Sequence, residues 1–470
     1  MAGALDDTIC AIATPPGEGG IGIIRLSGPR AIDIASRLVR LRSAAPLESV
    51  PSRVLSLAEV GARVTAVSPA SGHPLDEALV AVMRRPHSYT GEDVVELQCH
   101  GGPVILDQLC RLLLAEGARL AEPGEFTKRA FLNGRLDLVQ AEAVLDTIRA
   151  KTARSLSVAQ AQRRGDLSRE IAHVREQLVI ALAHVEAALD FVEEDIEFVP
   201  HDELARILQI IIDRLSKLVA TEQEGRIWRE GAAVAILGRP NVGKSSLMNA
   251  LLRTDRAIVT PIAGTTRDVL EESLSLAGIP IRLVDTAGIR PTYDPVEAEG
   301  IRRSQVAWGS ADLALILVDG SEPLTDDDRA LLAEPAAKEA VVLVNKCDLP
   351  MQTSAEAVQA ICPTRRGILE ISVQARTGLD ALRETIRRQL TPAGLESQES
   401  VLVTNLRQAA ALERALHGAR QAAESLGERR AGECIAMDLR IAADALGEVT
   451  GAITTDDILE RIFSEFCIGK

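Results

Sequence analysis

The sequence predicts a multidomain protein of mixed class, in which an α/β domain and an α+β domain accompany an all-helical domain. Residues 225–390 alternate short apolar runs with glycine-rich loops, a pattern typical of an α/β domain with a mostly parallel sheet. Apolar residues at helical steps of three and four occur both before and after that segment. The first 120 residues instead contain short apolar runs between proline and glycine turns, as strands do.

Residues 1–122 form the predicted α+β domain. Its expected strands cover 9–12, 22–26, 78–83 and 94–98, with Arg25 and Glu96 projecting from two of them. A helix is expected over 104–114, because Pro103 suits the first helical position. His100 precedes two glycines, which favours a structural role in a turn and leaves a catalytic role as the alternative.

Residues 123–224 and 391–470 are the two expected parts of a discontinuous helical domain. Helical periodicity runs through Leu167, Ile171, Val174, Leu178, Leu182, Val185, Leu189 and Val192, then through Leu204, Leu208, Ile211, Leu215 and Leu218. It resumes at Leu402, Leu406, Ala409, Ile435, Leu439, Leu446 and Val449. Gly225 and the stretch 391–394 mark the expected junctions. We therefore expect a nucleotide domain inserted into one helical bundle, with separate packing of the two helix sets as the alternative.

Four loop motifs follow predicted strands of the α/β domain, in the order in which a Ras-like GTPase sheet presents them. They are Gly238–Ser245, Gly264–Asp268, Asp285–Gly288 and Asn345–Asp348. The first lies between the apolar run 233–237 and an expected helix, where backbone N–H groups and the helix dipole face anions. The ordered set predicts a P-loop domain that binds and hydrolyses GTP.

Each motif has a chemical role. Lys244 is expected to neutralise the outer phosphates, and the hydroxyl groups of Ser245 and Thr266 are expected to ligate Mg2+, beside the carboxylate of Asp285. Asn345 and Asp348 predict guanine selection, because a carboxylate accepts two hydrogen bonds that adenine does not offer. The predicted GTP-binding residues are Asn241, Val242, Gly243, Lys244, Ser245, Ser246, Thr260, Pro261, Ile262, Ala263, Gly264, Thr265, Thr266, Asp285, Thr286, Ala287, Gly288, Asn345, Lys346, Asp348, Ser372, Val373 and Gln374.

Two catalytic groups common in small GTPases are missing from their usual places. Ile289 follows the Asp-Thr-Ala-Gly turn, where many small GTPases have a Gln that orients water. The next segment supplies Asp294, Glu297 and Glu299. The residue types alone do not show which of these carboxylates would orient the water. No arginine finger is evident, so a cation is expected to replace it, and Asn241 with the turn 260–266 offers oxygen ligands for potassium.

Composition narrows the classes of function. The 470 residues carry a formal net charge of −15 and only 2% aromatic residues, which argues against non-specific nucleic-acid binding, although a local basic patch stays open. No signal-peptide core and no apolar stretch of bilayer length is evident, so a soluble, cytoplasmic protein is expected. Seven cysteines without Cys-x-x-Cys spacing favour reduced thiols over disulfides or zinc.

Several phrases outside the nucleotide loops resemble one family across the whole chain. Together with those loops, the phrases 14–22, 91–98, 124–133 and 466–470 are similar to the MnmE (TrmE) family of tRNA modification GTPases, within the TrmE-Era-like GTPases. The resemblance implies an N-terminal domain that binds 5-formyl-tetrahydrofolate and dimerises. It also implies an MnmG-like FAD-containing partner in a heterotetramer or larger complex. Together they would install an aminomethyl or carboxymethylaminomethyl group on carbon five of the wobble uridine of certain tRNAs.

The resemblance also implies roles for individual residues. Folate contacts fall on Arg25, Glu96, Arg135 and Lys470, although the family commonly has Lys at position 135. Potassium ligands fall on Asn241, Thr260, Ile262 and Thr265. The carboxylate that acts on the attacking water falls on Glu297. Cys467 matches a thiol suspected of taking part in the modification, with packing beside Phe466 as the alternative.

Two other functions compete with tRNA modification. One is a nucleotide switch in ribosome assembly, similar to Era, although such relatives usually carry a basic RNA-binding module that this acidic chain lacks. The other is a GTP-regulated, folate-dependent one-carbon transferase. The sequence shows no flavin site for the redox step of the modification, so tRNA modification requires a partner.

The guanine assignment gives a first prediction. Replacing Asp348 by Asn should abolish GTP binding and favour xanthosine nucleotides, because the hydrogen bonds that select the base are exchanged. Sites built on such bonds discriminate by up to roughly 10⁴ to 10⁵. Nucleotide affinities measured by fluorescence titration test this, and unchanged GTP affinity in Asp348→Asn would remove the assignment.

Overall fold

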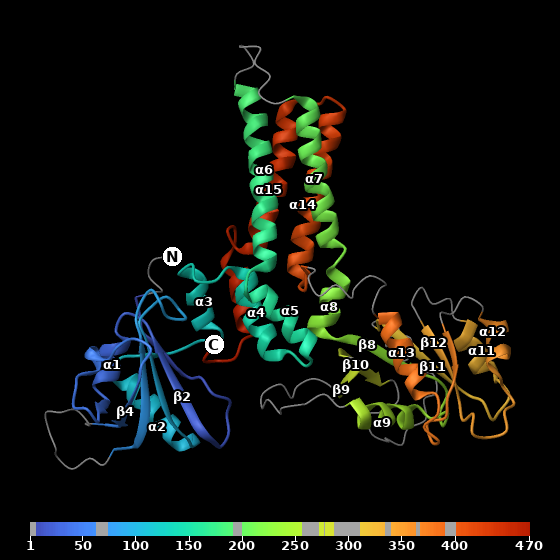
Figure 1. The fold of residues 1–470 in the computed structure, drawn as a ribbon, viewed down its shortest axis with the longest axis horizontal. Helices are drawn as coiled ribbons and strands as arrows, with labels where there is room; N and C mark the ends of the chain where they lie inside the picture. Colours follow the sequence, from blue (N-terminus) through green and yellow to red (C-terminus); the bar gives the residue numbers. More distant parts are fainter. Residues whose placement is uncertain are drawn as a thin grey trace. The chain divides into compact units, whose positions relative to one another are not determined.

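The fold consists of two compact units. The computed structural model describes residues 6–62, 74–190, 200–255, 272–276, 278–285, 311–333, 340–362, 367–390 and 401–470. Residues 1–145 and 446–470 form unit 1, and residues 146–445 form unit 2 (Figure 1). Segments from opposite ends of the sequence thus meet in unit 1. No helix among the described ranges is long and apolar enough to cross a membrane.

Unit 1 is built on a mixed sheet that has seven strands in the described residues, in the order β3-β4-β5-β6-β2-β1-β7. All neighbouring pairs are antiparallel except β1 and β7. The strands are β1 Ile9–Ile12, β2 Gly19–Ser27, β3 Val39–Leu41, β4 Leu55–Val60, β5 Asp76–Met83, β6 Val94–Gly101 and β7 Arg119–Leu120. Antiparallel neighbours β2 and β6 place Arg25 directly opposite Glu96.

Helices contribute to the apolar clusters of unit 1, of which two position the site. Helix α2 (Pro103–Ala115) buries Leu109 and Leu113 in the same cluster as the sheet residues Ile24 and Leu26. A second cluster joins Leu138 and Leu145 of α4 to residues near the end of the chain, Leu459, Phe463 and Phe466. The remaining helices of this unit are α1 Ala31–Ser36, the 3-10 helix η1 Leu47–Ser49, α3 Glu125–Leu132, α4 Leu138–Arg149 and α16 Asp456–Ser464.

Unit 2 contains a mostly parallel sheet with six strands in the described residues, in the order β13-β12-β11-β8-β10-β9. Only β9 runs antiparallel to its neighbour, β10. The strands are β8 Ala232–Leu237, β9 Glu272–Leu276, β10 Ile279–Asp285, β11 Leu313–Asp319, β12 Ala340–Asn345 and β13 Gly367–Glu370. All six residues of β8 are buried, which is typical of a parallel strand covered on both faces.

Helices cover both faces of this sheet. Helices α9 (Lys244–Asp255) and α13 (Leu379–Leu390) pack on one face through Leu247 and Leu382. Helices α11 (Asp326–Ala333) and α12 (Ala355–Ile361) pack on the other through Leu332 and Val358. This layered arrangement confirms the predicted α/β class.

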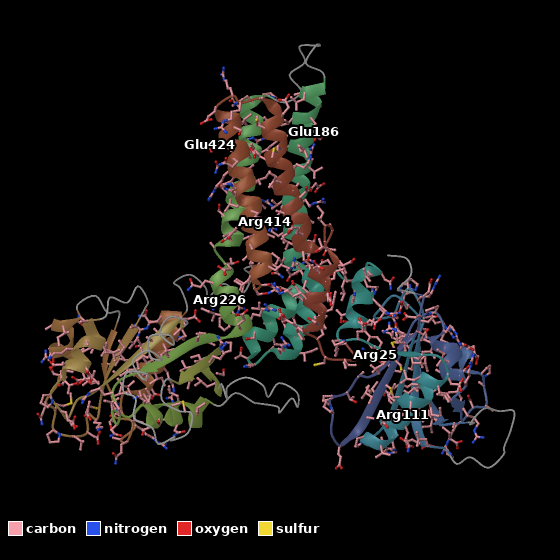
Figure 2. The ribbon with its side chains drawn as sticks, turned by 180° about the vertical axis from the view of Figure 1, so that it is seen from behind. Arg25, Arg111, Glu186, Arg226, Arg414 and Glu424 are labelled. Atoms are coloured by element: carbon pink, nitrogen blue, oxygen red, sulfur yellow. The ribbon has the colours of Figure 1, made fainter. Side chains whose placement is uncertain are left out.

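The long helices of unit 2 lie side by side in one bundle (Figures 1 and 2). Helix α7 packs on α14, His201 lies 2.9 Å from the carbonyl oxygen of Leu426, and Arg440 pairs with Glu186. Helices from before and after the sheet therefore join, which confirms the discontinuous helical domain. The helices are α5 Ala153–Arg163, α6 Asp166–Asp190, α7 His201–Val219, α8 Glu222–Glu230, α14 Leu406–Gly427 and α15 Gly432–Thr450, whose last residues belong to unit 1.

One helical expectation was wrong in detail. Leu402 is buried but lies in a non-helical stretch, because α14 begins only after Asn405, whose side chain caps the amide of Arg407. Gly225, expected to mark a junction, lies inside α8, which ends at Glu230. The stretch 391–394 and Val192 lie outside the described residues. The strands β3, β4 and β7 were not predicted from the sequence.

The position of Gly225 in α8 generates a prediction. A Cβ atom there would lie 2.0 Å from the carbonyl oxygen of Val403, so Gly225→Ala should lower the stability of the full chain by about 1–3 kcal/mol. The control is Gly427→Ala in α14, where nothing lies within 4 Å of the added atom. Thermal unfolding followed by circular dichroism checks this. An equal midpoint for both variants would contradict the close approach.

Candidate functional site

The predicted phosphate loop follows β8 and has the backbone that close approach of an anion requires. Gly238 has φ 145°, and a Cβ there would lie 2.5 Å from the carbonyl oxygen of Leu317 on β11. Gly243 has φ 105°, and its Cβ would lie 2.4 Å from the side-chain nitrogen of Asn345. Asn241, with φ 66°, is exposed. Only glycine fits at Gly238 and Gly243, because the backbone is in the left-handed region and protein atoms of β11 and Asn345 occupy the place of a Cβ atom. The loop thereby packs closely in front of the N-terminus of α9, a position suited to an anion.

Helix α9 starts at the end of this loop and directs its first N–H groups toward it. Ser245 and Ser246 are exposed in the first turn, while Val242 and Leu247 are buried. The ammonium group of Lys244 donates to the carbonyl oxygens of Gly238 and Arg239, both at 2.7 Å. The loop thus gathers a cation, a hydroxyl group and a helix N-terminus at one strand end, as phosphate and Mg2+ binding require.

Asn345 connects the phosphate loop to the base-selecting loops. It ends β12 and is only 3% exposed. Its side-chain N–H donates to the carbonyl oxygen of Val242 at 2.8 Å, and its oxygen accepts the amide of Val373 at 3.2 Å. One buried amide therefore fixes three loops that the sequence places 103 and 28 residues apart. The sequence predicted contact with the base and did not predict this bridge.

The loops after β12 and β13 differ in burial from residue to residue, and the carboxylate of Asp348 lies at the surface. Asp348 is exposed, Gln374 is exposed and Val373 is half-buried, while Ser372 is buried and accepts the amide of Ala375 at 3.0 Å. Lys346 is 2.5 Å from the buried carboxylate of Asp319, which lies opposite Asn345 in the sheet register. Burial opposes ionisation of Asp319, but hydrogen bonds from Lys346 and Ser321 hold its pKa below the usual value. Asp319 thus fixes Lys346, a role that the sequence did not indicate.

Arg239, which the sequence places near the phosphates, is held by acidic residues. Its guanidinium lies 2.9 Å from Asp328 on α11, whose side chain is 1% exposed, and 3.5 Å from Glu322. This pairing fixes the Arg239 side chain against α11.

Part of the predicted nucleotide site lies outside the described residues. These positions are Thr260, Pro261, Ile262, Ala263, Gly264, Thr265, Thr266, Thr286, Ala287, Gly288 and Glu297, together with Arg267, Ile289, Arg290, Asp294 and Glu299. Asp285 ends β10, parallel to β8, so its backbone lies at the same sheet edge as the phosphate loop.

A second cluster of predicted site residues comes together in unit 1. Arg25 donates from Nε and Nη2 to Glu96 at 2.9 and 2.7 Å, and from Nη1 to the carbonyl oxygen of Gly469 at 3.4 Å. The guanidinium lies over the rings of Tyr89 and Phe126, at 5.9 and 5.7 Å. An ion pair beside two aromatic rings suits a planar ligand with polar groups at its edge. Tyr89 and Phe126 were not predicted.

Lys470 belongs to the same cluster. Burial lowers the pKa of its ammonium group, and the nearby Arg25 lowers it further, while Glu96 and Cys467 act in the opposite direction. The thiol of Cys467 is exposed, whereas Phe466 is buried, so Cys467 does not share the packing of Phe466. Arg135 is exposed and donates to the carbonyl oxygen of Ser88 at 3.1 Å, next to Tyr89 in sequence.

Helix α3 seats the last residues of the chain. The amide of Phe126 donates to the backbone oxygen of Lys470 at 3.1 Å, and the amide of Gly124 to that of Cys467 at 3.5 Å. The helix is fixed in turn by Arg129, which is 1% exposed. This guanidinium pairs with Asp7, Glu92 and Glu125 at 2.5, 3.2 and 2.9 Å. Such a network positions α3, and through α3 the cluster around Arg25.

The structure also describes His100 and the cysteines, for which the sequence made predictions. His100 Nδ1 lies 2.8 Å from Asp76, which also accepts the His100 backbone amide at 2.8 Å, so the aspartate fixes the turn. All seven cysteines are free, and Cys10, Cys99, Cys110 and Cys362 are buried. The described residues contain no group of three or more His, Cys, Asp or Glu residues suited to a metal ion.

The parallel sheet, the glycine-lined loop before α9 and the Asn345–Asp348 loop at the same edge define a P-loop GTPase. Sequence relatives extend this result to the whole chain. A model of the MnmE helical domain matches residues 138–467, and a model of the N-terminus of the GTP-binding protein TrmE matches residues 8–135. The chain therefore belongs to the MnmE family of GTPases.

Individual relatives match over nearly their full length. The tRNA modification GTPase MnmE of Chloroflexus aurantiacus is 47% identical over 99% of this chain and 100% of that protein. The protein of the same name from Geobacter sulfurreducens is 46% identical, with the same coverage. A solved structure of Aquifex aeolicus Era bound to GDP.AlF4- is 28% identical over 40% of this chain and 66% of that chain, with a TM-score of 0.27, too low to support a structural conclusion.

The bridge made by Asn345 generates a prediction. Asn345→Ala would leave the carbonyl oxygen of Val242 and the amide of Val373 without this partner, which costs about 1–3 kcal/mol. GTP affinity should fall roughly 10- to 100-fold. The control is Gln352→Ala, an exposed side chain of unit 2 outside the predicted GTP-binding residues, which should change affinity by less than about threefold. Calorimetric titration distinguishes the two, and equal affinities would contradict the bridge.

Proposed function

We propose that this chain is a potassium-dependent GTPase that acts with a flavoprotein partner on tRNA. Together they would install an aminomethyl or carboxymethylaminomethyl group at carbon five of the wobble uridine. The observation that carries the proposal is a phosphate loop joined by Asn345 to a guanine-selecting edge, in a chain that matches proteins named tRNA modification GTPase MnmE over their full length.

The nucleotide chemistry divides among three groups of residues. The loop 238–245 and α9 would hold the phosphates, with Lys244 neutralising charge and Ser245 and Thr266 as the proposed Mg2+ ligands. Asn241, Thr260, Ile262 and Thr265 are the proposed potassium ligands, of which Asn241 is exposed at the loop. Glu297 is the proposed carboxylate that acts on the attacking water.

The cluster around Arg25 is the proposed site for 5-formyl-tetrahydrofolate. Arg25, Glu96 and Lys470 supply charges of both signs beside Tyr89 and Phe126, which suits a ligand with a planar ring system and hydrogen-bonding edges. Arg135 on the adjoining loop is the fourth proposed contact, and the exposed Cys467 is a proposed participant in the modification. Calorimetric titration of the folate into Glu96→Gln tests the site, and wild-type affinity there would exclude it.

The proposed partners are a second copy of the chain, an MnmG-like FAD protein and tRNA. A tRNA substrate places the activity in the cytoplasm, where translation occurs. We also propose that the domains follow the divisions 1–122, 123–224, 225–390 and 391–470. A role in ribosome assembly, or as a GTP-regulated one-carbon transferase, remains the alternative that the next experiment distinguishes.

The proposed function is tested on bulk tRNA from cells that lack this protein, with and without a plasmid copy. Wobble-uridine nucleosides are quantified by mass spectrometry after digestion. Loss of the aminomethyl family of nucleosides, restored by the wild-type copy, is expected. An unchanged nucleoside profile with defective ribosomal particles would instead support the assembly switch.

The proposed cation site predicts a salt effect on the GTPase rate. GTP hydrolysis should be roughly tenfold or more faster in potassium than in sodium at equal ionic strength, because the bound cation takes the place of an arginine finger. Steady-state phosphate release measures this, with GTP affinity in both salts as the control. Equal rates would reject the potassium site.

The proposed role of Glu297 predicts a separation of binding from turnover. Glu297→Ala should bind GTP with nearly wild-type affinity and lose hydrolysis by roughly 10² to 10⁴, the usual range for a general base. Asp294→Ala serves as the matched control in the same segment. Wild-type turnover of Glu297→Ala would transfer the role to another carboxylate.

A further inference from the structure

A cationic stretch in unit 2 departs from the acidic character of the chain. Residues 147–165 contain Arg149, Lys151, Arg154, Arg163 and Arg164 but neither Asp nor Glu, although the whole chain has a net charge of −15. The stretch joins the end of α4 to the whole of α5, and these cations are exposed except Arg154, which is half-buried. Positive charge is therefore concentrated on one short segment.

The acidic residues that flank this stretch are paired with arginines. Asp146 pairs with Arg229 at 2.8 Å, and Glu170 pairs with Arg214 at 3.3 Å. Asp166 is shared between Arg164 at 3.3 Å and Arg169 at 2.5 Å. Each of these carboxylates thus faces at least one arginine, and the arginine of the stretch that takes part is Arg164.

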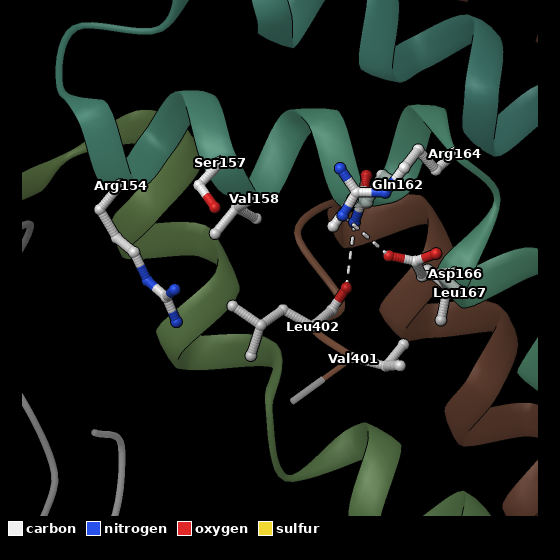
Figure 3. A pocket seen from close by; sticks show the side chains of 10 residues that line it. Arg154, Ser157, Val158, Gln162, Arg164, Asp166, Leu167, Val401 and Leu402 are labelled. Atoms are coloured by element: carbon white, nitrogen blue, oxygen red, sulfur yellow. Dashed lines mark hydrogen bonds and ion pairs between the residues drawn. The ribbon is translucent and has the colours of Figure 1, made fainter. Parts of the chain in front are cut away.

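A pocket of ≈ 280 Å³ lies against α5, with an arginine at each end (Figure 3). Arg154 and Arg164 are ten residues apart, which corresponds to about 15 Å along a helix. Ser157 lies between them, and Leu402 closes the opposite side. Gln162 is 3% exposed and donates to the Leu402 carbonyl oxygen at 3.0 Å, so the wall of the pocket is fixed.

The cation at one end of the pocket is held in position by its surroundings. The guanidinium of Arg154 lies over the ring of Trp228 at 5.9 Å. The nearby carboxyl of Glu224 is 6% exposed, and burial raises its pKa, whereas the hydrogen bond with Trp228 and the charge of Arg154 lower it. The carboxylate of Asp166 is the acidic group at the other end, and Arg164 and Arg169 face it.

These features match a chain of phosphates better than a single small anion. Phosphates of one strand follow each other at about 3.4 Å along the axis of a duplex, so two arginines about 15 Å apart span several of them. Guanidinium groups bind phosphate through two parallel hydrogen bonds. Since only 2% of the residues are aromatic, binding through the backbone rather than through stacked bases is expected.

We propose that the pocket and cations of residues 147–165, the α5 surface, form the place where the phosphate backbone of tRNA docks. This inference rests on the proposed function, which supplies tRNA as the partner. It adds the location of the tRNA-binding surface and the kind of contact, which is between cationic side chains and phosphate groups. It also offers an acidic chain a place to hold a polyanion, because this segment of unit 2 carries five cations and neither Asp nor Glu.

The test compares two triple variants of the full chain that lose the same amount of charge. The first is Lys151→Gln, Arg154→Gln and Arg164→Gln on the α5 surface. The control is Arg206→Gln, Arg388→Gln and Arg430→Gln, exposed arginines of unit 2 that each lie near a glutamate. Binding of an unmodified tRNA transcript is measured by fluorescence anisotropy between 50 and 200 mM salt. Intrinsic GTP hydrolysis, which should equal the wild-type rate in both, checks folding.

Affinity of the α5 variant at 150 mM salt should fall roughly 10- to 100-fold, and the slope of log affinity against log salt should decrease by about 2 to 3. The control should stay within about threefold of wild type. Equal affinities of the two variants would overturn the inference, as would loss of binding to the flavoprotein partner with unchanged tRNA affinity. A wild-type protein that binds tRNA here without altering wobble nucleosides in cells would refute the proposed function alone.

Discussion

The nucleotide site depends on one buried amide at the edge of a parallel sheet. Parallel strands end on the same side, so β8, β10 and β12 bring three distant loops to one edge. Loops at such an edge are still free to move apart. Asn345 removes that freedom, because its two polar atoms bond the phosphate loop on one side and the loop after β13 on the other. Loss of either partner would leave a polar atom of the buried Asn345 side chain without a hydrogen bond, which is unfavourable, so the two loops are fixed together.

Features that depend on residues adjacent in the sequence were predictable, whereas contacts between residues far apart in the sequence were not. The phosphate loop, the helix after it and Asp348 were predictable, because their chemistry requires particular residues at adjacent positions. Asp319 was not, because its contact with Lys346 arises only when β11 and β12 pair in register. Arg129 was missed for the same reason, since its partners lie as far away in sequence as Asp7.

The helical region shows why local patterns are ambiguous. Leu402 stands four residues before Leu406, which satisfies helical periodicity, yet burial of one side chain does not require a helix. Gly225 was expected to mark a domain junction. Inside α8 it allows close packing, because the carbonyl oxygen of Val403 occupies the space of a side chain. Glycine and apolar spacing each have two structural meanings, and tertiary contacts decide between them.

The composition of unit 1 has a consequence for the order in which the molecule is made. Its second core needs Leu138 and Leu145 from early in the chain and Leu459, Phe463 and Phe466 from near its end. All of residues 146–445 are synthesised in between. At roughly 5–20 residues per second, a ribosome needs tens of seconds for that interval. During translation α4 is therefore synthesised well before the segment that completes its core. Only a chain that has been translated through residue 470 can bring Lys470 to Arg25.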